Sequence, residues 1–121
     1  MLEKHFQKKV ITRLRKLPGN PWVTKLNDLT TIGLPDVIVM VEGKGFALEL
    51  KTKSKLSEIQ YVTLEKMEKA GWETFVATPE NFNEIFSYIE GHAAGSAARF
   101  KKPARFPHWV LPKSAKKLLI F

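Results

Sequence analysis

The chain has 121 residues, a formal net charge of +8 at pH 7 and no cysteine. This length suits one domain with its own hydrophobic core, and the lack of cysteine excludes disulfides, thiolate metal ligands and a cysteine nucleophile. The charged start MLEKHFQKK has no apolar segment typical of a secretory signal. The longest unbroken apolar run, residues 37–41, is too short to cross a bilayer. We therefore expect a cytoplasmic protein.

The first predicted element is an amphipathic helix over residues 2–17, ended by Pro18-Gly19. At about 100° per residue, its apolar face is formed by Phe6, Val10, Leu14 and Leu17. Glu3 and Gln7 project onto this apolar face rather than onto the charged one. Glu3 is either a residue of a frayed first turn, favoured there by the helix dipole, or it points at a polar site beside the core.

Three strands are expected next. Residues 21–26 form a short candidate strand, and the β-branched run at 37–41 reads as a buried one. The segment 42–45, EGKG, predicts a turn. Residues 46–51 alternate between apolar positions and a second face. The last two runs predict a hairpin.

The second half of the core predicts two further helices and a strand between them. Ser57-x-x-Gln60 is a capping-box pattern that starts the first of these helices, and Gly71 is placed to end it. Residues 74–78 form the strand, and Thr78-Pro79 starts the final helix. The order α-β-β-β-α-β-α predicts an α/β fold with a mixed sheet flanked by helices.

Residues 91–99, GHAAGSAAR, separate a core of residues 1–90 from a basic C-terminal extension of residues 91–121. The core carries 13 Lys/Arg and 12 Asp/Glu, whereas the extension carries no acid. Such a segment attracts polyanions, nucleic acid first and an anionic membrane surface second; a tail that only aids solubility is the alternative. The basic residues that we expect to contact DNA are Arg99, Lys101, Lys102, Arg105, Lys113, Lys116 and Lys117.

The hairpin contains three charged residues whose positions need an explanation. If residues 42–45 form the turn, Val41 faces Phe46. Asp36 then faces Lys51 and is diagonal to Glu49, and the three side chains share one face, with the two acids about 7–8 Å apart at the backbone. Hard carboxylate oxygens suit Mg²⁺ or Mn²⁺ rather than zinc. Such an ion lowers the pKa of bound water, which can then attack phosphorus. Lys51 could orient that water or offset charge on the phosphate.

A plainer alternative is that these residues form a cross-strand ion pair on a solvated face. Asp36 would then be an ordinary strand-entry residue after a proline. The continuous apolar run at 37–41 weighs against this alternative, because it is typical of a strand buried on both faces. A charge on such a strand costs free energy unless it is paired or bound to a metal.

The segment Gly33-Leu34-Pro35-Asp36, followed after twelve residues by Glu49-Leu50-Lys51 and then by Gln60 in a helix, resembles the PD-(D/E)xK nuclease superfamily. Within it, the pattern is similar to the VRR-NUC group, near the archaeal-type Holliday-junction resolvases. The likeness covers about residues 3–86 and implies an αβββαβ restriction-endonuclease-like core.

The resemblance also implies roles for individual residues. Asp36, Glu49 and the Leu50 carbonyl would bind Mg²⁺ or Mn²⁺. The catalytic residues that it implies are Lys51, Glu3 and Gln60. Gln60 has the capping-box role as its alternative, and one side chain cannot fully serve both.

The function implied by the resemblance is a metal-dependent endodeoxyribonuclease that prefers branched DNA, in a bacterial or virus-infected bacterial cell. Cutting two strands of a junction needs two active sites, so we expect a homodimer. The apolar segments 109–111 and 118–121 suit a dimer contact. The alternatives are a restriction, repair or flap-type nuclease with the same site, a catalytically silent DNA-binding module, and a membrane-surface protein bound through residues 99–121.

Overall fold

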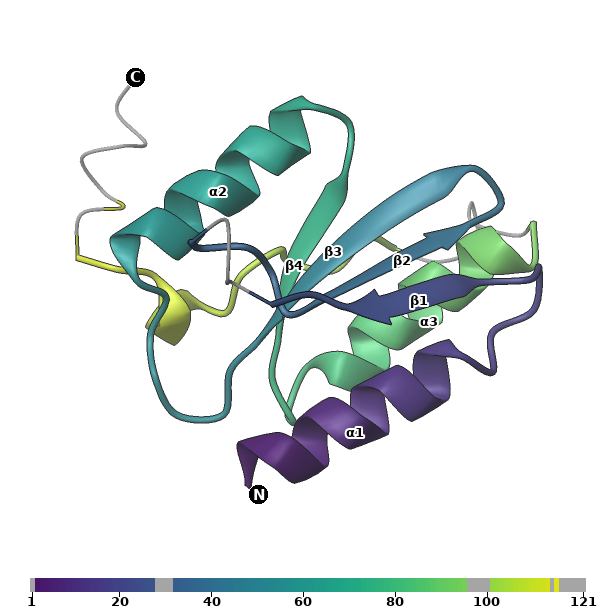
Figure 1. Cartoon of the computed structure of the whole chain (residues 1–121), viewed down its shortest axis with the longest axis horizontal. Coiled ribbons are helices and arrows are strands. Elements are labelled where there is room, and N and C mark those ends of the chain that lie inside the picture. The colour runs from purple at the N-terminus through teal and green to yellow at the C-terminus, as the bar shows by residue number, and fades with distance from the viewer. Residues whose placement is uncertain (1, 28–31, 96–100, 114, 116–121) are drawn as a thin grey trace.

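A computed structural model describes residues 2–27, 32–95, 101–113 and 115 (Figure 1). The elements are α1 (Glu3–Leu14), β1 (Trp22–Lys25), β2 (Val37–Val41), β3 (Lys44–Leu50), α2 (Glu58–Lys69), β4 (Glu73–Ala77), α3 (Phe82–Ala93) and a short 3-10 turn, η2 (His108–Val110). The predicted order of helices and strands is confirmed. In the described part of the chain, no helix has the length and apolar character needed to span a membrane.

The four strands form one mixed sheet in the order β1-β2-β3-β4. β2 is antiparallel to both β1 and β3, and β4 is parallel to β3. Helices α1 and α3 cover one face of the sheet and α2 covers part of the other (Figure 1). The larger hydrophobic core lies beneath α1 and α3, and a smaller one lies between α2, β4 and the C-terminal extension.

The β2–β3 hairpin closes in a turn of two residues, which corrects the predicted register. Glu42 and Gly43 both have left-handed backbone angles, with φ of 51° and 75°, and two such residues form the tight turn that matches strand twist. Val41 therefore pairs with Lys44. The predicted pairing of Val41 with Phe46 is wrong, because it placed Lys44 and Gly45 in the turn.

Gly45 belongs to β3, where it pairs with Met40, and the Trp72 side chain packs against it. A Cβ atom at this position would be 2.7 Å from two carbons of the Trp72 ring, closer than side chains normally approach. The glycine thus serves close packing, although in the sequence it has the appearance of a turn residue.

The basic extension packs on the core through its described residues. The Val76 N–H on β4 donates to the Arg105 carbonyl at 2.8 Å, and the Leu56 N–H donates to the Val110 carbonyl at 2.8 Å. Helix α3 continues to Ala93, past the start of the predicted linker at residue 91. Residues 101–113 therefore pack against the core.

Candidate functional site

Asp36 is the residue before β2. It lies at the end of the sheet where β1, β3 and β4 finish. Extending the observed β2–β3 register by one pair sets Asp36 directly opposite Glu49, so the predicted diagonal placement, with Asp36 facing Lys51, is wrong. The Asp36 Oδ2 atom accepts a hydrogen bond from the Leu50 N–H at 2.8 Å. The Asp36 carbonyl accepts another from the Leu26 N–H at 2.9 Å. These contacts fix the carboxylate against the end of β3.

Leu50 turns its backbone toward this carboxylate. In a strand, the N–H and C=O of one residue point to the same side, so the Leu50 carbonyl faces the β2 side as its N–H does. The next position in the β2–β3 register is Pro35, which has no N–H to donate. The Leu50 carbonyl is thus oriented toward the Asp36 end of the sheet, as the metal-ligand role requires.

Glu49 and Lys51 flank Leu50, and Glu49, the neighbour within β3, lies on the opposite face of the sheet from the Leu50 side chain. Glu49 is 2% exposed and pairs across the parallel ladder with Val76, which lies in the core beneath α2. Lys51 follows the strand, is half-buried, and donates its N–H to the Ala77 carbonyl at 3.0 Å. The backbone that carries these two side chains is therefore held by the β3–β4 ladder.

A small cleft connects the Asp36 end of the sheet to the start of α1. It has a volume of about 240 Å³ and is lined by Glu3, Lys4, Gln7, Asp36 and Leu50. The structure thus brings Glu3 to the same cleft as Asp36. The sequence interpretation missed Lys4 and Gln7 as lining residues. Gln7 carried a signal, since it is polar, lies on the apolar face and follows Glu3 by one helical turn.

Gln60 is engaged at the start of α2. The Ser57 N–H donates to Gln60 Oε1 at 3.0 Å, and the Gln60 N–H donates to Ser57 Oγ at 3.2 Å. This reciprocal pair confirms the predicted capping box. Gln60 does not line the cleft that holds Glu3, and α2 packs on the opposite face of the sheet from α1 (Figure 1).

The metal-ligand set can be compared with this geometry. Among the residues that the structure describes, no three His, Cys, Asp or Glu side chains are grouped closely enough to hold a metal ion. The donors at the strand ends are two carboxylates and one carbonyl. Mg²⁺ accepts such a set because it keeps several waters and prefers hard oxygen ligands. The donor types thus suit magnesium or manganese, with Asp36 and Leu50 lining the cleft and Glu49 opposite Asp36 in the extended strand register.

Two of the predicted DNA-binding residues form contacts with other side chains of the same molecule. Arg105 Nη2 lies 2.6 Å from both Glu65 Oε1 and Thr74 Oγ1. Lys102 Nζ lies 3.4 Å from Glu73 Oε1. Lys101 and Lys113 are exposed, and the predicted contacts Arg99, Lys116 and Lys117 lie outside the described residues.

The apolar part of the extension is also divided between inside and outside. Val110 is fully buried in the smaller core, together with Leu56 and Leu64. Trp109 remains 40% exposed. Residues 118–121, which were predicted to serve a dimer contact, lie outside the described residues.

A second polar cluster lies at the hairpin end of the sheet, around Glu73. Its carboxylate is 8% exposed and accepts a 2.6 Å hydrogen bond from the Tyr88 hydroxyl. Lys44, Lys102 and His92 lie 3.3, 3.4 and 3.7 Å from its oxygens. Burial raises the pKa of Glu73, but the Tyr88 hydrogen bond and the lysines outweigh it and leave the pKa below its ordinary value.

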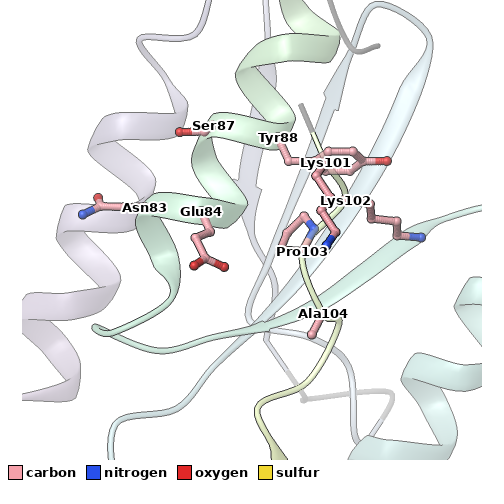
Figure 2. Close-up of a pocket in the computed structure, with 8 residues that line it drawn as sticks. All are labelled: Asn83, Glu84, Ser87, Tyr88, Lys101, Lys102, Pro103 and Ala104. Carbon is pink, nitrogen blue, oxygen red and sulfur yellow. The ribbon is translucent and has the colours of Figure 1, made fainter. Parts of the chain in front are cut away.

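A larger cavity borders this cluster rather than the strand ends. It has a volume of about 610 Å³ and lies between α3 and the extension, where Tyr88 and Lys102 line it (Figure 2). Glu73 pairs with Phe46 at the start of β3, while Asp36 lies beside the end of β3. The cavity is therefore separate from the candidate site.

No protein-family model, curated protein or solved structure matches this chain. The chemistry of the site is therefore inferred from its own residues. Two carboxylates and a carbonyl can hold a hard cation, and an ammonium beside them can bind an anionic substrate. Of these groups, Asp36 and Leu50 line the cleft beside the first turn of α1, whereas Glu49 and Lys51 do not line it.

Proposed function

We propose that the chain is a metal-dependent endonuclease that hydrolyses phosphodiester bonds in DNA. Its core would be the αβββαβ restriction-endonuclease-like fold of the PD-(D/E)xK superfamily, with the VRR-NUC group as the most similar pattern. The order α1-β1-β2-β3-α2-β4 supports this proposal. The observation that carries it is the hydrogen bond from the Leu50 N–H to Asp36 Oδ2, which joins the two halves of the motif.

The proposed ligands of the cation are Asp36, Glu49 and the Leu50 carbonyl. A bound Mg²⁺ or Mn²⁺ would supply Lewis acidity toward the phosphate and lower the pKa of water. The protein's part is to hold these oxygens in place before substrate arrives. Asp36 is fixed by its hydrogen bond to Leu50, and Glu49 is fixed by burial.

Lys51 and Glu3 would act on either side of the scissile phosphate. The Lys51 ammonium can orient the attacking water or offset the negative charge that builds on phosphorus. Glu3, from α1, lines the cleft that contains Asp36 and can accept a hydrogen bond from water there. For Gln60 we propose the capping role, since its Oε1 already accepts from Ser57.

The proposed substrate is branched DNA, and the proposed active form is a homodimer. The likeness of the motif to archaeal-type resolvases supports this choice. Two strands of a junction must be cut at symmetric positions, so two copies of the site related by a two-fold axis are needed. A nuclease of the restriction, repair or flap-cutting kind would use the same residues on another DNA structure.

One experiment tests the site and the substrate together. Purified protein is incubated with a four-way junction, a flap, a duplex and single-stranded DNA, each with Mg²⁺, Mn²⁺ or EDTA. We expect symmetric nicks on the junction that require a metal ion and disappear in Asp36→Asn and Lys51→Ala. The matched controls are Glu90→Ala and Lys66→Ala, which remove an exposed acid and an exposed lysine elsewhere.

Three outcomes bear on the proposal. Cleavage that survives in Asp36→Asn at the wild-type rate would falsify the site. Equal cutting of all four DNAs would remove the branched-DNA preference and leave the nuclease. DNA binding without cleavage under any metal would support the catalytically silent alternative.

A further inference from the structure

A second groove continues from the candidate site along α1. It has a volume of about 410 Å³, and the residues that line it are Lys4, Gln7, Lys8, Ile11, Thr12, Arg15 and Lys25. Two of these, Lys4 and Gln7, also line the cleft that holds Asp36. The cleft and this surface, here called the α1 groove, therefore form one continuous path that leads from Arg15 to Asp36.

The α1 groove is positively charged and holds no carboxylate among its lining residues. Its four cations, Lys4, Lys8, Arg15 and Lys25, are all exposed. The ion pairs among the described residues use Lys44, His92, Lys102 or Arg105 as the cation. Thus no ion pair with a described acid offsets the four groove charges, whereas acids offset Lys102 and Arg105 in the extension.

The spacing of the cations suits a chain of phosphates. Lys4, Lys8 and Arg15 lie four and seven residues apart, which places them on one helix face. Eleven residues at about 1.5 Å each span roughly 16 Å, the axial rise of about five nucleotides at about 3.4 Å per step. Lys25 pairs with Val37, so it adds its charge near the Asp36 end of the path.

The neutral residues of the groove fit the same ligand. Gln7 and Thr12 offer side-chain donors of the kind that contact phosphate and sugar oxygens without reading bases. An α1 face that is merely solvated would explain the exposed lysines equally well. It would not explain why the basic path runs without a carboxylate into a cleft that contains Asp36 and Leu50.

We propose that the sugar-phosphate backbone of the DNA strand lies along the α1 groove. Arg15, Lys8 and Lys25 contact phosphates spaced along the strand, and Lys4 leads the strand into the Asp36 cleft. The identification of this strand as the one to be cut rests on the proposed function. Phosphate contact is thereby assigned first to α1, and only second to the basic extension.

The test measures binding separately from cleavage. Full-length wild type and the Lys8→Gln/Arg15→Gln variant are titrated with a labelled four-way junction in EDTA at 50–200 mM salt. We expect the slope of log affinity against log salt to become less negative by about 1.8, because each lost phosphate contact contributes about 0.9. Affinity at the lowest salt should fall by about tenfold or more.

The matched control is Lys66→Gln/Lys69→Gln, which removes the same charge from the exposed end of α2. It should keep the wild-type slope. A Lys8→Gln/Arg15→Gln slope equal to that of the control would overturn the proposal. Thermal unfolding of both variants should match wild type, so that a binding change reports contact and not misfolding.

Cleavage kinetics with Mg²⁺ distinguish failure of the groove from failure of the proposed function. If the groove positions substrate, Lys8→Gln/Arg15→Gln raises KM and leaves kcat near wild type. A wild type that binds with the full salt slope and never cleaves would reject the nuclease and retain the groove. A wild type that cleaves, with a variant indistinguishable from it in slope and KM, would reject the groove and retain the nuclease.

Discussion

The Asp36 carboxylate accepts a 2.8 Å hydrogen bond from the Leu50 amide and so replaces a backbone acceptor at the end of the sheet. The strand partner at this point of the register is Pro35, which lacks an N–H and so leaves the Leu50 carbonyl without a ladder donor. The Asp36 side chain therefore accepts the last N–H of β3 and also places a negative charge in the candidate site. Under the proposed function, Asp36 would serve both stability and activity, and variants must be chosen to separate the two.

Asp36→Asn and Asp36→Ala should differ in stability and agree in activity. Asparagine keeps an oxygen that can accept from the Leu50 N–H, whereas alanine leaves that donor without this acceptor at a cost of about 1–2 kcal/mol. Both remove the negative charge, so both should lose metal-dependent cleavage. Urea unfolding and a cleavage assay on the same samples measure the two effects. An asparagine variant that unfolds as readily as the alanine variant would contradict the role given to the hydrogen bond.

The order of elements could be predicted because each rests on a local signal. The apolar positions of α1 recur with helical period, and the capping box at Ser57 predicts the start of α2. The hairpin register could not be predicted in the same way. It depends on left-handed angles at Glu42 and Gly43 and on the Trp72 ring over Gly45, and that contact joins residues distant in sequence.

Gly45→Ala tests that packing directly. A Cβ at Gly45 would lie 2.7 Å from the Trp72 ring, so the variant should be destabilised by about 1–3 kcal/mol. In a double-mutant cycle, Trp72→Leu should recover part of this loss, because the residues are in contact. Denaturant unfolding of the single and double variants measures the coupling. Strictly additive effects would show that the ring is not what excludes a side chain.

Gln60 substitutions separate the cap from a catalytic role. Gln60→Ala removes the acceptor for the Ser57 N–H and should destabilise the protein by about 0.5–1 kcal/mol. Gln60→Glu keeps the capping box and should keep stability. Cleavage per folded molecule should stay near wild type in both variants. A large loss of kcat in Gln60→Glu, with stability intact, would instead indicate that the side chain reaches the site.

The candidate site was predictable in residue type but only partly in arrangement. The acids of the hairpin are visible because charges within apolar runs are unusual, and Glu3 because it interrupts an apolar helix face. Which cations remain exposed is a different matter. Arg105 is bound by Glu65 and Thr74, and these contacts between distant segments leave no periodic trace in the sequence. The sequence therefore could not show that Arg105 is engaged within the molecule, whereas Lys101 and Lys113 are exposed.

Glu73 should make stability depend on pH in the acid range. Its folded-state pKa is below the ordinary value, so the unfolded chain binds this proton more readily. The contribution of Glu73 is therefore complete above the ordinary pKa of about 4.3 and is lost as pH falls through the folded-state value. Thermal unfolding between about pH 3 and pH 6 should show this loss.

Glu73→Gln should remove that part of the pH dependence. At neutral pH it should lower the free energy of unfolding by about 1–3 kcal/mol, because charge-assisted contacts with Lys44 and Lys102 are lost. The variant and the wild type should therefore converge in stability at acid pH. Exposed Glu84→Gln serves as the control and should run parallel to wild type. A constant gap between Glu73→Gln and wild type across the titration would contradict the assignment.

Arg105 and the exposed lysines of the extension should respond in opposite ways to charge removal. Arg105→Gln breaks the 2.6 Å contacts with Glu65 and Thr74 and should cost about 1–3 kcal/mol of stability, with the salt slope of DNA binding unchanged. Lys101→Gln/Lys113→Gln should leave stability within about 0.5 kcal/mol. If these lysines contact phosphates, that double variant should reduce the slope by about 1.8. Paired unfolding and salt titrations measure both quantities. A charge that pairs only within the protein releases no counterion from DNA. If Arg105→Gln stays folded and still makes the slope of log affinity against log salt less negative, the Arg105 guanidinium must leave Glu65 and contact a phosphate when DNA binds.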